Sequence, residues 1–193
     1  MGGATPLADS RAVLARIPPE IVASFEKKKL QYVRNYGSVD LPWHEVFQTH
    51  DRRQVEAFCA SNRISFEWTG NDGLRTRQIT PATEIHPVSG EKVWFNQAHL
   101  FHISGLCGEV ARDMQSVYRV DDLPRNVYFG DGTPIDTDEL NRIRAAYDEV
   151  TFHFDWRKDD IVLLDNMLYT HGRQPYSGLR KILVGMADLR KRA

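Results

Sequence analysis

A short apolar run near the C-terminus, Ile161 to Leu164, places the strongest constraint on how this chain can fold. Four consecutive apolar residues between polar neighbours are typical of a β-strand that is buried on both faces. Asp165-Asn166 ends the run, and Pro175 together with Gly178 predicts a tight turn. Lys181 to Met186 then predicts a second strand that returns beside the first.

Two side chains with metal-binding and anion-binding chemistry accompany these strands. His171 lies near a strand end, and Arg180 begins the facing strand nine residues later. A neutral imidazole can ligate a metal ion, and a guanidinium can hold a carboxylate through two parallel hydrogen bonds. By this chemistry alone, a structural role for the histidine is the commoner interpretation.

The composition fits one soluble domain. A chain of 193 residues suits a single domain that buries roughly 70% of its unfolded surface. Its 25 basic and 26 acidic residues leave no charge excess to favour nucleic acid or an anionic membrane. No apolar stretch approaches the roughly 20 residues of a membrane helix, and no signal peptide is visible. Cys59 and Cys107 are too few for a disulfide scaffold, so we expect a cytoplasmic protein.

Residue periodicity predicts a mixed, β-rich α+β domain, in which strands joined by turns alternate with inserted helices. Residues 1–8 show neither a helical nor a strand period. The first expected helix is capped by Asp9 or Ser10 and ends at Ile17, and the second covers residues 20–28. A helical turn follows from Pro42-Trp43, then a helix capped by Asp51, and finally a helix over residues 136–147 capped by Thr137. The expected strands are 30–36, 64–68, 74–79, a hairpin over 85–95 that turns at Ser89-Gly90, 126–129 and 150–156.

Several segments together carry a family resemblance. They are the run around His171, Gly2-Gly3-Ala4-Thr5-Pro6, Arg34-Asn35-Tyr36, Trp94-Phe95-Asn96-Gln97, Tyr128-Phe129-Gly130-Asp131-Gly132 and Asp165-Asn166. With these segments the chain resembles the Fe(II)/2-oxoglutarate-dependent dioxygenases of the TauD/TfdA superfamily, and most nearly their SyrP-like and clavaminate synthase-like branch.

The resemblance implies a fold and a set of site residues. The fold is the double-stranded β-helix, or jelly roll, with inserted helices, of which residues 1–193 would form the C-terminal portion without the early strands. His171 would be an iron ligand, and Thr5 and Arg180 would bind the distal carboxylate of 2-oxoglutarate. Arg173 and Asn96 are weaker candidates for contacts to substrate or to the loop beside the metal.

The implied reaction is an oxygenation. The cofactors would be Fe(II) and 2-oxoglutarate, with O₂ as co-substrate. Decarboxylation of 2-oxoglutarate to succinate and CO₂ would accompany hydroxylation of a small, amino-acid-like substrate, in keeping with secondary metabolism. The sequence does not specify which substrate is used.

The family's other two iron ligands form a His-x-Asp or His-x-Glu motif that precedes the Gly-Gly segment, and this sequence has no room for that motif before Gly2. His153-Phe154-Asp155 matches the His-x-Asp motif. It lies, however, on the strand before the His171 strand, where the family has no ligands. His99 and His102 are three residues apart and would share a helical face, without an assigned carboxylate partner.

Two interpretations of the missing ligands stay open. The chain would be either a fragment or late-started form of an active oxygenase, or a catalytically inactive relative that acts as a binding or interaction domain. Because removal of early strands exposes sheet edges, we also expect homo-oligomerisation.

Overall fold

Helices and antiparallel strands alternate along the chain, which confirms the α+β expectation. The computed structural model describes residues 2–37, 40–70, 72–179 and 181–188. The strands are β1 (Thr5–Asp9), β2 (Leu30–Tyr36), β3 (Ile64–Thr69), β4 (Gly73–Thr80), β5 (Thr83–Ile85), β6 (Lys92–Trp94), β7 (Arg125–Phe129), β8 (Phe152–Phe154) and β9 (Tyr169–His171). The α-helices are α1 (Ser10–Arg16), α2 (Pro19–Lys28), α3 (Trp43–Val46), α4 (Arg52–Ser61), α5 (Ala98–Phe101), α6 (Gly108–Val117) and α7 (Thr137–Val150).

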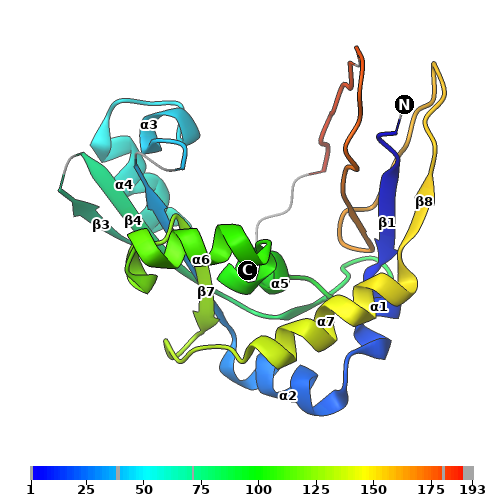
Figure 1. The fold of residues 1–193 in the computed structure, drawn as a ribbon, viewed down its shortest axis with the longest axis horizontal. Coiled ribbons are helices and arrows are strands. Elements are labelled where there is room, and N and C mark those ends of the chain that lie inside the picture. Colours follow the sequence, from blue (N-terminus) through cyan, green and yellow to red (C-terminus); the bar gives the residue numbers. More distant parts are fainter. Residues whose placement is uncertain (1, 38–39, 71, 180, 189–193) are drawn as a thin grey trace.

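The larger sheet has the strand order β3-β4-β2-β7, and every neighbouring pair is antiparallel. Leu30 lies opposite Thr80 on one side and Phe129 on the other, so β2 is a central strand. Figure 1 shows this sheet at one end of the molecule, with α3 and α4 beside it. The predicted hairpin also forms: β5 pairs with β6, and Gly90 takes a positive φ of 72° in the connecting turn.

A second sheet, with the order β8-β1-β9, stands at the other end of the molecule (Figure 1). Its central strand is β1, which includes Thr5 to Ala8 although residues 1–8 show no strand period in the sequence. The partners of β1 lie more than 140 residues later in the chain. Because those distant strands supply the hydrogen bonds, a local pattern does not reveal β1.

Aspartates begin several helices as the sequence indicated. The carboxylate of Asp9 accepts a hydrogen bond from Arg11 N at the start of α1, and Asp51 does the same for Arg53 N at the start of α4. Helix α7 is capped by Asp136, which accepts from Asp138 N, and the expectation that Thr137 is the cap is therefore wrong. No helix in the described part of the chain is long and apolar enough to cross a membrane.

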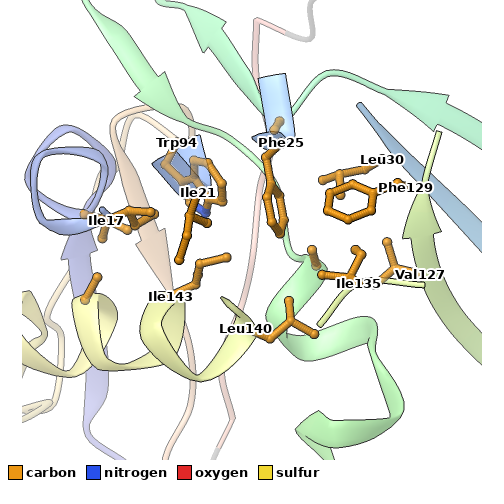
Figure 2. Close-up of a cluster of buried hydrophobic side chains, with 14 of the residues drawn as sticks. Ile17, Ile21, Phe25, Leu30, Trp94, Val127, Phe129, Ile135, Leu140 and Ile143 are labelled. Carbon is orange, nitrogen blue, oxygen red and sulfur yellow. The ribbon is translucent and has the colours of Figure 1, made fainter. Parts of the chain in front are cut away.

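The main hydrophobic core lies where α2 and α7 meet β2, β6 and β7 (Figure 2). Phe25 is at its centre, with ring centroids 5.5 Å from Trp94 and 5.2 Å from Phe129. Leu140 and Ile143 of α7 point into the same cluster and are fully buried (Figure 2). This core joins the helices to both sheets, and it holds β1 in place because Ala8 is one of its members.

The C-terminal strands expected from the sequence do not form. Residues 161–164 have no regular secondary structure, and Ile161 and Leu163 are 93% and 96% exposed, so the prediction of a strand buried on both faces is wrong. Residues 181–186 are likewise irregular, and Leu183 is 83% exposed. An apolar run becomes a buried strand only where other elements cover it, and the described residues supply no such cover here.

Candidate functional site

The β8-β1-β9 sheet brings the two ends of the chain together. Leu7 lies opposite His171 on β9 and opposite Phe152 on β8, while Thr5 lies opposite Phe154. Side chains of paired residues, and of residues two apart on one strand, share a face of the sheet. Thr5 and His171 therefore lie on the same face, roughly 7–8 Å apart as diagonal neighbours.

The pairing between β1 and β9 continues beyond the assigned strands. Gly172 N donates to Pro6 O and Gln174 N donates to Ala4 O, each at 3.0 Å. Arg173 lies between these two hydrogen bonds, which places it opposite Thr5. By alternation Arg173 is on the same face as Thr5 and His171, and it is exposed.

The two glycines at the start of the chain permit a close backbone approach. Gly2 and Gly3 have φ values of 86° and 79°, which L-residues with side chains seldom adopt. A Cβ atom on Gly2 would lie 2.8 Å from Pro175 O, and Gly3 N donates to that same oxygen. The Gly-Gly segment therefore keeps β1 registered against the segment that follows His171.

The hydroxyl of Thr5 has an aromatic partner that the sequence did not indicate. Trp156 Nε1 donates a hydrogen bond to Thr5 Oγ1 at 2.6 Å, and the ring of Trp156 packs against Phe154 with centroids 4.9 Å apart. Trp156 is separated from Thr5 by 151 positions, so no local pattern connects the two.

A buried histidine holds the turn that leads into β9. The Asp165 carboxylate accepts backbone hydrogen bonds from Met167 and Leu168, and His86 Nε2 lies 3.0 Å from Asp165 Oδ2. Burial raises the pKa of the Asp165 carboxyl, but the hydrogen bonds from Met167 and His86 outweigh it, so the pKa is lower than usual. The Asp165-Asn166 segment thus positions the strand that carries His171.

The alternative ligand pair His153 and Asp155 does not face His171. His153 lies opposite Pro6, and so it occupies the face of the sheet opposite to Thr5. That face carries Ala8, which packs into the hydrophobic core. Asp155 lies two residues after His153. When the alternation of β8 is continued past Phe154, Asp155 falls on the same face of the sheet as His153.

His99 and His102 also have structural surroundings. His99 is 7% exposed, and its ring stacks on Tyr147 with centroids 4.3 Å apart. Burial, helped by the nearby positive charge of Arg144, lowers the pKa of His99 to about 4. Helix α5 ends at Phe101, and His102 Nδ1 accepts a hydrogen bond from Ser104 N beyond it, so the two histidines do not share a helical face.

Two further residues were expected in the site. Asn96 is buried, its amide donates to Ala82 O at 2.8 Å, and its side-chain oxygen accepts from Ala98 N at 3.1 Å, so both ends of its side chain stabilise the local backbone. Arg180 lies outside the described residues.

The described residues do not complete a metal site. Among them, no group of three His, Cys, Asp or Glu side chains is arranged to hold a metal ion. His171 is thus a single imidazole on its sheet face, and it does not by itself fit an iron ion that needs three protein ligands. A cavity of about 460 Å³ lies elsewhere, between the larger sheet and the α3–α4 region, and none of its lining residues carries a charge.

Comparison with known proteins shows the family to which this chain belongs. The profile of the family described as "Taurine catabolism dioxygenase TauD, TfdA family" matches residues 1–187. The dapdiamide synthesis protein DdaC of Enterobacter agglomerans is 42% identical over 188 residues, which cover 97% of this chain and 57% of that protein. A clavaminate synthase-like protein of Arabidopsis thaliana is 29% identical over 196 residues, in a match that covers 96% of this chain and 56% of that protein.

The chain therefore spans about half the length of the curated relatives that it matches. The match to the family profile nevertheless extends over almost every residue, including both Thr5 and His171. This chain belongs to the TauD/TfdA dioxygenase family.

Proposed function

We propose that this chain contributes one part of the active site of an Fe(II)/2-oxoglutarate-dependent oxygenase that hydroxylates a small, amino-acid-like substrate. The observation that carries the proposal is the shared sheet face of Thr5, His171 and Arg173. Membership of a dioxygenase family supports the reaction class. The name of DdaC, a dapdiamide synthesis protein, supports a place in secondary metabolism.

The sheet face has donors suited to the distal carboxylate of 2-oxoglutarate. A hydroxyl and a guanidinium are both hydrogen-bond donors, and a guanidinium adds positive charge. Thr5 supplies the hydroxyl, and Arg173 supplies a guanidinium opposite it. Arg180 is proposed as a further carboxylate ligand on the family resemblance alone.

His171 is proposed as one iron ligand, and the other two ligands are proposed to come from outside the described residues. The described residues alone do not form a complete ligand set. We further propose that the β8-β1-β9 sheet is part of a jelly roll whose remaining strands cover the exposed segments 161–164 and 181–186.

Turnover tests this proposal. Succinate formation from 2-oxoglutarate would be measured with Fe(II), O₂ and a panel of small amino acids, on this chain and on a polypeptide of the relatives' full length. Loss of an outer-shell partner of a metal typically costs about 10–100-fold, and loss of a ligand should cost at least as much. We expect His171→Ala to reduce turnover of the longer polypeptide by at least about 100-fold, and His153→Ala, on the opposite sheet face, to leave it within about twofold.

Unchanged turnover in His171→Ala would contradict the ligand assignment. A second candidate function is favoured by the incomplete ligand set: a binding domain that holds 2-oxoglutarate or a similar dicarboxylate without oxidising it. Saturable 2-oxoglutarate binding without succinate formation, in the longer polypeptide as well, would establish this second function.

A further inference from the structure

We propose that Trp156 is a positioning residue that fixes the Thr5 hydroxyl as a hydrogen-bond donor to a carboxylate on the face of β1 that also carries His171 and Arg173. The inference rests on the proposed function, because the carboxylate is taken to be the distal one of 2-oxoglutarate. It assigns a role to a residue that lies beyond the end of β8 and whose indole nitrogen donates to Thr5 Oγ1.

The direction of the contact between Trp156 and Thr5 follows from elementary chemistry. An indole N–H can only donate, whereas a hydroxyl has one proton to donate and two lone pairs that accept. Thr5 Oγ1 therefore accepts from Trp156 Nε1 across 2.6 Å and keeps its own proton for another partner. Within the described part of the chain, the Thr5 hydroxyl donates no hydrogen bond.

Both groups are held before any ligand arrives. Thr5 is on the central strand of its sheet, with backbone pairing on both sides. The Trp156 ring is half-buried and packs on Phe154, which lies directly opposite Thr5. Accepting a hydrogen bond also polarises a hydroxyl and strengthens its own donation, so Trp156 orients Thr5 and makes it a better donor.

The neighbouring charge selects an anion as the acceptor. Arg173 lies opposite Thr5 and forms no ion pair with any residue that the structure describes. A hydroxyl donor beside an uncompensated guanidinium favours a carboxylate over a neutral carbonyl, because charge-assisted hydrogen bonds are roughly twice as strong.

The hydrogen bond can be tested without any ligand. The chain contains four tryptophans, so a ¹H–¹⁵N spectrum should show four indole N–H signals, and Trp156→Phe identifies one by removing it. We expect Thr5→Val to shift that signal and speed its exchange with water, and Thr5→Ser, which keeps the hydroxyl, to restore it. The other three signals should stay unchanged, including that of Trp68, whose indole donates to Glu56. A Trp156 signal that Thr5→Val does not affect would overturn the proposal.

The positioning role is tested by titration with 2-oxoglutarate, followed through the same spectra. We expect Thr5→Val and Trp156→Phe each to weaken binding about 10-fold, as expected for one hydrogen bond to a charged group. The double variant should bind no more weakly than Thr5→Val alone, because the proposed effect of Trp156 on the carboxylate passes through that hydroxyl. Binding of 2-oxobutanoate, which lacks the distal carboxylate, should be insensitive to all three variants.

The outcomes separate this inference from the function on which it rests. Normal binding of 2-oxoglutarate by Trp156→Phe, or additive losses in the double variant, would overturn the positioning role alone. If the folded wild-type chain does not respond to millimolar 2-oxoglutarate, both the carboxylate role and the proposed function fail for this chain.

Discussion

At the scale of single residues, His99 couples folding to pH. Its pKa of about 4 in the folded chain lies below the ordinary value of 6.5 because burial disfavours the charged ring. Above pH 6.5 the ring is neutral in both states and its contribution to stability is complete. As the pH falls from 6.5 to 4, the unfolded chain takes up a proton first, so stability is lost.

We expect His99→Phe, which keeps an aromatic ring against Tyr147, to remove this loss. The difference between wild type and variant should change by about 3 kcal/mol between pH 7 and pH 4, since one pKa unit corresponds to about 1.4 kcal/mol. Urea unfolding at several pH values measures it. Parallel pH profiles for the two proteins would show that the His99 ring is not buried in its neutral form.

Other single residues show what sequence can and cannot predict. Asp9 and Asp51 were predictable as caps because the capping hydrogen bond spans only two residues. Asp159 has a positive φ of 72°, which no local sequence pattern indicated. The contact between Trp156 and Thr5 was not predictable, because it depends on the register of β8 against β1.

At the scale of elements, α7 depends on the residue that precedes it and caps its first turn. Asp136 caps this helix, which contributes Leu140 and Ile143 to the core, and the neighbouring Thr137 is exposed. We expect Asp136→Ala to cost about 1 kcal/mol. For a chain of this length, that lowers Tm by roughly 2–4 °C. Thr137→Ala is the matched control and should change Tm by less than about 1 °C in thermal unfolding followed by circular dichroism. Equal losses in both variants would contradict the assignment of the cap.

Helices and hairpins were predicted more successfully than the strands around the site. The 3.6-residue period of α7 and the turn between β5 and β6 are local signals. In contrast, β1 gave no signal, and 161–164 gave a strong strand signal without forming a strand. Strand formation depends on partners, and both errors arise where the partners lie far away in the chain or outside the described residues.

At the scale of the whole molecule, apolar side chains remain exposed along the C-terminal segments. Ile161, Leu163 and Leu183 are 83–96% exposed, which a stable monomer rarely tolerates in one region. We expect the isolated chain to self-associate in a concentration-dependent manner, as measured by sedimentation velocity. Ile161→Ser combined with Leu163→Ser should shift the distribution toward monomer, whereas Val88→Ser, at an exposed hairpin tip, should not. A wild-type chain that stays monomeric at high micromolar concentration would contradict this expectation.

The most direct test of the proposal that the sheet face of Thr5, His171 and Arg173 is part of an active site is an anaerobic titration with Fe(II) and 2-oxoglutarate. The titration is monitored by the visible charge-transfer band of the chelate. Because the described residues hold no three-ligand group, we expect no saturable band from this chain alone. We expect one from a polypeptide of the relatives' full length, abolished by His171→Ala and kept in His153→Ala. A saturable band that survives His171→Ala would contradict the proposal that this sheet face carries the iron ligand.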